Sequence, residues 1–191
     1  MRRSLQQRVT DTLPQAIPFQ DACFRNVSQH FANTRDIRSA KVSFITGGRY
    51  NHKGVFEALY LSCDIHTCLE ETTKSTQRDG FEVARSLPRT IIAFSVKLQT
   101  VLDLTNPAVL NKINVSRSKL MKTDWEYVQE VEGKEAITQQ IGRFARQAGF
   151  EAIIVPSAVA KGCNLVIFPD KLQSHSYFKV LNRRLLGPPR P

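Results

Sequence analysis

The 191-residue sequence has little of what marks several large classes of protein. Its four cysteines are scattered along the chain, which argues against the disulfide framework of a small secreted domain. No stretch reaches the roughly 18 consecutive apolar residues of a membrane-spanning helix. The basic N-terminus is not followed by a hydrophobic segment, so it does not resemble a secretory signal. We therefore expect a cytoplasmic protein that does not bind membranes.

The composition is that of a chain with one hydrophobic core. Nine glycines and nine prolines are too few for a collagenous or low-complexity chain, and 41% hydrophobic residues are too many for a disordered one. Lysine and arginine total 27 against 17 aspartates and glutamates, a net charge of +10. This charge indicates an anionic partner, which is a nucleic acid, a phosphorylated small molecule or an acidic protein. Charge alone does not choose among them.

Common catalytic and metal-binding motifs are missing. The sequence has no phosphate-binding P-loop, no dinucleotide-binding glycine pattern and no metalloprotease helix motif. Cys63, His66 and Cys68 lie close together, but their spacing does not match a zinc site, so we expect core packing and no metal. Ser157 lacks the flanking glycines of a hydrolase nucleophile. No helix-turn-helix, RRM or zinc-finger pattern supports direct nucleic-acid binding, which stays a remote alternative.

Apolar runs and capping residues predict an α+β fold with one domain, built on a small mixed β-sheet with flanking helices. Helices are predicted after Asp64, from the Asn106–Pro107 cap, and after Thr138 with a stop at Gly149. We expect an N-terminal arm over 1–20, the domain over 21–172 and a C-terminal tail over 173–191, frayed at 187–191. About six short strands are predicted, at 24–27, 58–62, 90–96, 101–104, 152–155 and 165–168.

Polar residues at the ends of these elements are the candidate site. Arg49 lies in a Gly-Gly-Arg turn, and its planar guanidinium suits phosphate. Tyr60 alternates with two leucines, so it points to the opposite face of its strand, towards a cleft or a second layer. On the helix after Asp64, an inward face of Ile65, Cys68, Leu69 and Thr72 places Glu71 at the flank and Glu70 nearer to solvent. The residues alone make this set suggestive only.

Six segments in this order resemble the RES domain, the toxin of bacterial RES–Xre toxin–antitoxin systems. The resemblance covers about residues 24–172. On it, the Arg, Glu and Ser of the family name correspond to Arg49, Glu71 and Ser157, with Glu70 left as an alternative carboxylate. The segments are 47–51, 58–62, 67–71, 138–142, 149–158 and 164–170.

The resemblance implies an ADP-ribosyltransferase-like fold and an enzyme that acts on NAD+ without a cofactor. Glu71 would stabilise the ribose cation, while Arg49 and Arg25 would hold the pyrophosphate. Tyr60 would stack on nicotinamide, Ser157 would position a ribose or the carboxamide, and Asn51 is expected among the NAD+-binding residues. No metal is expected, because the leaving group is already a cationic pyridinium.

The resemblance leaves the acceptor and the partners open. The leading hypothesis is growth arrest by NAD+ depletion, with water or inorganic phosphate as the acceptor. The alternatives are mono-ADP-ribosylation of a host protein and an inactive RES-like binding module. The family implies an Xre-type antitoxin that covers the active site, and toxin self-association is also plausible.

Overall fold

The computed structural model describes residues 3–33, 35–78 and 87–186, and in these parts the chain forms an α+β fold. This architecture, one mixed sheet with flanking helices, confirms the predicted fold class. None of the described helices has the length and apolar character needed to cross a bilayer. The strands are β1 (Ile17–Ser28), β2 (Leu59–Ser62), β3 (Arg89–Asp103), β4 (Ala152–Pro156), β5 (Cys163–Ile167) and β6 (Tyr177–Val180). The α-helices are α1 (Leu5–Thr10), α2 (Lys41–Thr46), α3 (Ile65–Arg78), α4 (Pro107–Ile113), α5 (Arg117–Lys122), α6 (Trp125–Glu130) and α7 (Ile137–Ala148).

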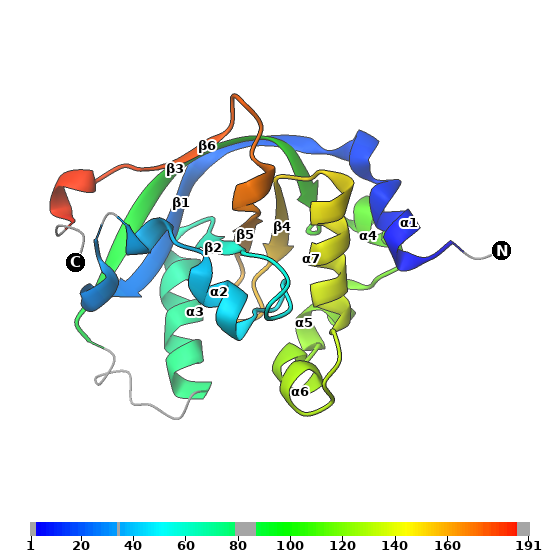
Figure 1. Ribbon diagram of the computed structural model, residues 1–191, viewed down its shortest axis with the longest axis horizontal. Coiled ribbons are helices and arrows are strands. Elements are labelled where there is room, and N and C mark those ends of the chain that lie inside the picture. Colours follow the sequence, from blue (N-terminus) through cyan, green and yellow to red (C-terminus); the bar gives the residue numbers. More distant parts are fainter. Residues whose placement is uncertain (1–2, 34, 79–86, 187–191) are drawn as a thin grey trace.

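The sheet is strongly curved because its strand pairings close on themselves. Its order is β1-β2-β5-β4-β3-β6, and β1 also pairs with β3 along most of its length. All pairs are antiparallel except β3 with β4. Figure 1 shows the long β1 and β3 arching over the shorter strands, with α3 towards one end of the sheet and α7, α4 and α1 towards the other.

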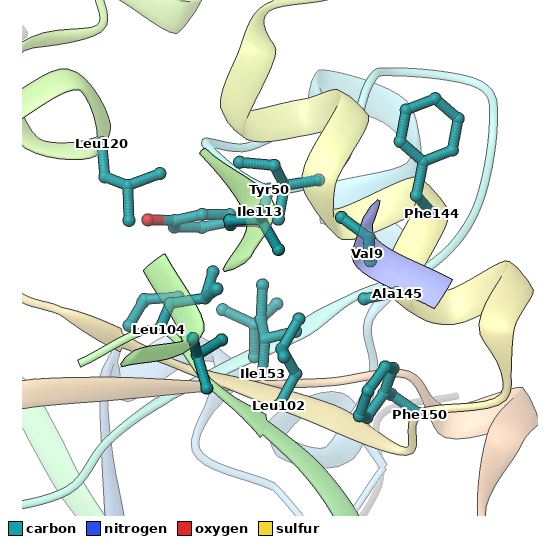
Figure 2. Packing of buried hydrophobic residues seen from close by; sticks show 14 of the residues in the cluster. Val9, Tyr50, Leu102, Leu104, Ile113, Leu120, Phe144, Ala145, Phe150 and Ile153 are labelled. Atoms are coloured by element: carbon teal, nitrogen blue, oxygen red, sulfur yellow. The ribbon is translucent and has the colours of Figure 1, made fainter. Parts of the chain in front are cut away.

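Alternating side chains on the central strands create two hydrophobic cores. In β4, Ile153 and Val155 face one core, while Ala152 and Ile154 face the other. The first core packs against α1, α4 and α7, as Figure 2 shows for residues around Ile153. Both faces of β4 and β5 are therefore buried, which explains why these strands read as continuous apolar runs.

Helix boundaries follow the predicted capping signals. The Asp64 carboxylate accepts a hydrogen bond from the Thr67 amide at 2.8 Å at the start of α3. Asn106 caps α4 in the same way through the Ala108 amide, and Gly149 ends α7 with a left-handed φ of 97°. These three predictions are confirmed.

The predicted inward face of α3 is wrong at Ile65 and Leu69, whereas Cys68 is buried as predicted. Ile65 and Leu69 are 50% and 46% exposed, whereas Thr67 and Cys68 are buried. The buried face of α3 therefore includes Thr67 and Cys68, and the half-buried Glu71 follows them by four and three positions on the same side of the helix. Most described contacts of helix α3 with the sheet are to β1 and β2, and its Glu71 also bonds Asn164 on β5.

The sheet is more extensive than its apolar runs predict. β1 begins at residue 17, inside the expected arm, and the strands predicted at 90–96 and 101–104 are a single strand, β3. β6 lies within the expected tail and pairs with β3. Val9 on α1 is completely buried in the first core, so the segment before β1 is part of the fold. The expected frayed end at 187–191 lies outside the described residues.

A buried carboxylate joins three segments of the chain. Glu151, fully buried before β4, accepts hydrogen bonds from the backbone amides of Gln99, Thr100 and Gln173 at 2.6–2.9 Å. Burial opposes ionisation, but these hydrogen bonds outweigh it and hold the pKa of Glu151 below its ordinary value. The ionised carboxylate therefore stabilises the fold at neutral pH.

We predict that Glu151→Gln lowers the free energy of unfolding by roughly 2 to 4 kcal/mol at pH 7, because an amide replaces one acceptor oxygen with a donor. The depressed pKa contributes stability above the unfolded-state value of about 4.3, and this contribution is lost as the pH falls through the folded-state pKa. Denaturant unfolding at pH 7 and pH 3 measures both effects. Glu57→Gln, an exposed control, should change neither; an equal loss at both pH values would contradict the assignment.

Candidate active site

A cavity lies between α2, α3 and α6, over the central strands. Its volume is about 620 Å³. It is lined by residues far apart in the sequence, including Arg25 on β1, Arg49 in the loop after α2, Tyr60 on β2 and Glu71 on α3. Four of the six site residues expected from the sequence therefore converge here. Further lining residues are Ser43, Gly48, Lys74, Trp125, Glu126, Val155, Ala158 and Asn164.

The Glu71 carboxylate is held from one side. Its Oε1 accepts hydrogen bonds from Ser157 Oγ at 2.7 Å and from Asn164 Nδ2 at 2.6 Å. Ser62 Oγ donates to Asn164 Oδ1 at 2.8 Å, which orients the amide so that its nitrogen faces Glu71. No described residue donates a hydrogen bond to Oε2, so this oxygen is available to a ligand.

Ser157 positions Glu71 and does not itself line the cavity. It is 1% exposed, and its Oγ accepts hydrogen bonds from the amides of Val159 and Ala160. With the hydroxyl oxygen already accepting from two amides, its proton is directed at the carboxylate. The residue expected to contact the substrate is thus a support for the carboxylate beside it.

Tyr60 presents its ring to the cavity while its hydroxyl is used by the protein. The hydroxyl accepts from the Tyr50 amide at 3.0 Å and donates to Asn51 Oδ1 at 2.8 Å. Burial raises the pKa of Tyr60 above its ordinary range, so the hydroxyl stays protonated. Its neighbours Leu59 and Leu61 face the other core, which confirms the predicted orientation.

Asn51 lies behind Tyr60 and is not among the residues that line the cavity. It is completely buried, and its Nδ2 donates to the carbonyl oxygens of Ser43 and Phe56. All of its side-chain bonds therefore go to the protein. The structure places this expected NAD+-binding residue in a supporting position, where it orients Tyr60.

The Gly-Gly-Arg turn has no room for larger residues. A Cβ at Gly48 would lie 2.6 Å from the Tyr60 hydroxyl oxygen, and one at Gly142 on α7 would lie 1.9 Å from the Tyr50 carbonyl oxygen. The Gln139 amide, also on α7, donates to the Gly48 carbonyl at 3.1 Å. The turn is thus packed closely between β2 and α7, and this packing fixes the position of the Arg49 backbone.

Two arginines at the cavity are anchored by neutral oxygens. Arg49 Nη1 donates to the carbonyls of Leu120 and Thr123, at 3.2 and 2.9 Å. Arg25 Nη1 donates to two carbonyls of the 37–39 segment. Desolvation lowers the pKa of Arg25 from its ordinary value. Because carbonyl dipoles orient a guanidinium without neutralising it, both cations remain able to attract an anion.

The two adjacent glutamates differ in position, and the cavity has further polar and aromatic residues in its lining. Glu71 lines the cavity, whereas Glu70 does not. Asn164, Trp125 and Lys74 also line it, and sequence reasoning did not select them as site residues. The one available signal was for Asn164, a polar residue at the start of an apolar strand. Among the described residues, no group of three or more His, Cys, Asp or Glu side chains is arranged to hold a metal ion.

This arrangement suits a ligand with anionic and cationic parts. The guanidinium groups of Arg25 and Arg49, the carboxylate of Glu71 and the ring of Tyr60 line the same cavity. An anionic group would bind the arginines, and a centre of developing positive charge would be stabilised beside Glu71 Oε2. A planar ring would stack on Tyr60 or Trp125.

Comparisons with known proteins agree with this fold. The RES domain profile matches residues 23–183. NAD(+) phosphorylase MbcT of Mycobacterium tuberculosis H37Rv is 24% identical over 157 residues, which cover 81% of this chain and 77% of that protein, and the Mycobacterium bovis protein of the same name matches equally. The crystal structure of the M. tuberculosis MbcT–MbcA toxin–antitoxin complex superposes with a TM-score of 0.70 at 20% identity, covering 93% of this chain and 91% of that chain.

We predict that Tyr60→Phe destabilises the protein by roughly 1 to 3 kcal/mol, because the Tyr50 amide loses its acceptor and Asn51 loses a donor. The phenyl ring keeps the floor of the cavity in place. Chemical unfolding measures the loss, and Tyr127→Phe, which removes a hydroxyl from a residue that is 53% exposed, is the matched control. Equal stability of Tyr60→Phe and the unmodified protein would show that the hydroxyl does not organise the turn.

Proposed function

The chain belongs to the RES domain family, and on this premise we propose that it is the toxin of a toxin–antitoxin system, an enzyme that cleaves the nicotinamide–ribose bond of NAD+. NAD+ depletion then arrests growth. The observation that supports this most directly is the Glu71 carboxylate. Its Oε1 is held by two hydrogen bonds, and its Oε2 has no hydrogen-bond donor among the described residues. It lines a cavity of about 620 Å³ together with Arg25 and Arg49.

Glu71 suits the charge that develops when nicotinamide leaves. Cleavage passes through an oxocarbenium-like state, in which positive charge spreads over the ribose C1″ and ring oxygen. Glu71 Oε2 accepts a hydrogen bond from a ribose hydroxyl, and this bond strengthens as the charge grows. Ser157 and Asn164 keep the carboxylate in place, so little reorganisation is needed at the moment of reaction.

The rest of the cavity accounts for the other parts of the substrate. Arg49 and Arg25 hold the pyrophosphate through guanidinium nitrogens that their carbonyl anchors leave free. The Tyr60 ring stacks on nicotinamide, and Trp125 offers a second aromatic surface. The chemistry assigned to these side chains requires no metal or cofactor, because nicotinamide departs as a neutral molecule from a cationic pyridinium.

The proposed partner is an antitoxin of the Xre type that covers the cavity. The solved neighbour is a toxin–antitoxin complex. Apolar side chains surround the cavity mouth here: Val42 on α2 and Val159 after β4 both line it and are 64% and 37% exposed, and Ile45 next to them on α2 is 71% exposed. A partner that buried these residues would also close the entrance, and the net charge of +10 favours an acidic one.

We predict that the purified protein releases nicotinamide from NAD+, and that Glu71→Gln lowers this rate by about 100-fold or more. Ser157→Ala should lower it less, by about tenfold, because Asn164 still holds the carboxylate. Glu70→Gln is the matched control, since Glu70 does not line the cavity. Mass spectrometry of the products, with and without phosphate, measures the rates and identifies the acceptor.

Each product of that experiment has a distinct meaning. Free ADP-ribose indicates hydrolysis, and ADP-ribose 1″-phosphate indicates phosphorolysis. Nicotinamide that appears only with cell lysate, together with labelled protein, indicates the alternative of mono-ADP-ribosylation. A folded protein that turns over no NAD+ in any of these conditions contradicts the enzymatic proposal and favours a binding module.

Trp125 provides an independent test of where NAD+ binds. It is the single tryptophan of the chain and lines the cavity. We predict that NAD+ quenches the intrinsic fluorescence of the inactive Glu71→Gln variant, because a ring stacked near the indole provides a contact quencher. Titration should give a saturating curve. Unchanged fluorescence in a variant that still binds NAD+ by calorimetry would place NAD+ elsewhere.

A further inference from the structure

Tyr50 belongs both to the first hydrophobic core and to the lining of the cavity. It is 2% exposed, and its backbone is fixed on two sides. The Tyr50 amide donates to the Tyr60 hydroxyl at 3.0 Å, and its carbonyl lies so close to α7 that a Cβ at Gly142 would be 1.9 Å from the oxygen. The ring therefore starts from a position that β2 and α7 define.

The Tyr50 hydroxyl has no hydrogen-bond partner among the described residues. In Figure 2 its oxygen, drawn in red, lies on the Leu120 side of the core cluster and away from Phe144 and Phe150. Leu120 also supplies one of the two carbonyl oxygens that anchor Arg49. The hydroxyl is thus directed towards the part of the cavity that Arg49 borders.

Two charged groups of the cavity act on this hydroxyl. Burial raises the pKa of Tyr50 above its ordinary range, while the Arg49 guanidinium lowers the pKa and the Glu71 carboxylate raises it further. Both groups are therefore near enough to interact with the phenol, and the net rise keeps the hydroxyl protonated at neutral pH. A protonated hydroxyl that the protein leaves unused is a hydrogen-bond donor available to a ligand.

The donors that line the cavity are of different kinds. The arginines are cations, which suit the phosphate oxygens of a dinucleotide, and Tyr60 and Asn164 donate within the protein. The Tyr50 hydroxyl is neutral, and Ala58 and Val155 share with its ring both the core and the cavity lining. A neutral donor in apolar surroundings suits a neutral acceptor on a flat, largely apolar group. The oxygen of an aromatic carboxamide is such an acceptor.

We propose that Tyr50 is a specificity-determining residue whose hydroxyl donates a hydrogen bond to the carboxamide oxygen of the nicotinamide ring. The assignment rests on the proposed cleavage of NAD+. With the ring stacked on Tyr60, this hydrogen bond fixes the rotation of nicotinamide in its own plane. The bond from nicotinamide to ribose C1″ is thereby oriented beside Glu71, and the Tyr50 hydroxyl keeps its proton throughout the reaction.

A contact with one atom of the substrate predicts a pattern across substrate analogues. The acetylpyridine analogue of NAD+ keeps the carbonyl oxygen, whereas the thionicotinamide analogue replaces this oxygen with sulfur, a weaker acceptor. We expect Tyr50→Phe to lower kcat/KM about tenfold for NAD+ and for the acetylpyridine analogue, but less than about threefold for the thionicotinamide analogue. Each ratio compares two proteins on the same substrate, so differences in leaving-group reactivity cancel.

Stability distinguishes this role from a structural one. Because no described residue bonds to the Tyr50 hydroxyl, Tyr50→Phe should leave the denaturant midpoint of unfolding unchanged or slightly raised. Tyr60→Phe should lower that midpoint, since the protein uses the Tyr60 hydroxyl twice. Tyr127→Phe is the matched control for activity, because Tyr127 is exposed and is not among the residues that line the cavity; it should change neither the midpoint nor kcat/KM.

Three results would overturn the assignment. An unchanged kcat/KM of Tyr50→Phe for NAD+ would show that the hydroxyl makes no contact with the substrate. An equal fall for all three substrates would place the hydroxyl against another part of the dinucleotide. A midpoint of unfolding lowered as much as in Tyr60→Phe would make the hydroxyl a structural group.

Direct binding separates this inference from the proposed function. Titration calorimetry measures the binding of NAD+, and of ADP-ribose, which lacks nicotinamide, to the Glu71→Gln variant with and without Tyr50→Phe. Removal of the hydroxyl should weaken the binding of NAD+ about tenfold and change the binding of ADP-ribose by less than about twofold. If the unmodified protein cleaves no NAD+ but this difference is observed, the proposed function fails and the nicotinamide contact stands. If NAD+ is cleaved but both ligands respond equally to Tyr50→Phe, the nicotinamide contact fails alone.

Discussion

The Glu71 carboxylate depends on three segments that meet only in the folded sheet. Ser157 follows β4, Asn164 begins β5, and Ser62 ends β2, where it orients Asn164. The pairings Val155↔Asn164 and Ser62↔Asn164 set this arrangement. A shift of β5 by one residue would turn Asn164 to the other face, and the carboxylate would lose its anchor. The register of β5 therefore decides the chemistry of the cavity.

The sequence predicts the parts of this arrangement that have local causes. Alternation in β2 predicts which way Tyr60 points. The continuous apolar runs at β4 and β5 predict strands that are buried on both faces, and in the structure helices cover one face and the curved sheet covers the other. Asp64, Asn106 and Gly149 mark helix ends through their own backbone contacts. The preference for Glu71 over Glu70 rests on the family resemblance and on a helical face of which Cys68 is the buried member. In the structure Glu71 lines the cavity and Glu70 does not.

What the sequence does not predict depends on contacts between distant residues. β1 and β3 are long because they pair with each other, and their polar ends carry no apolar signal of their own. Trp125 reaches the cavity only because α6 is placed there by the rest of the fold. The hydrogen bonds of Ser157 to Glu71 on α3 and of Asn51 to Tyr60 on β2 are likewise set by the fold and are not predicted by the local sequence.

The basic residues behind the net charge of +10 differ in whether a carboxylate neutralises them. Arginines on α7 are neutralised by carboxylates, as in the pairs Arg143–Glu135 and Arg146–Asp170. Arg25 and Arg49, which border the cavity, are instead held by neutral carbonyl oxygens, which orient the guanidinium groups without neutralising their charge. Carboxylate partners would have stabilised these cations as well but would have removed their attraction for a ligand. Neutral anchors on these arginines thus leave a cavity that attracts anions, while the Glu71 carboxylate remains available to a centre of developing positive charge.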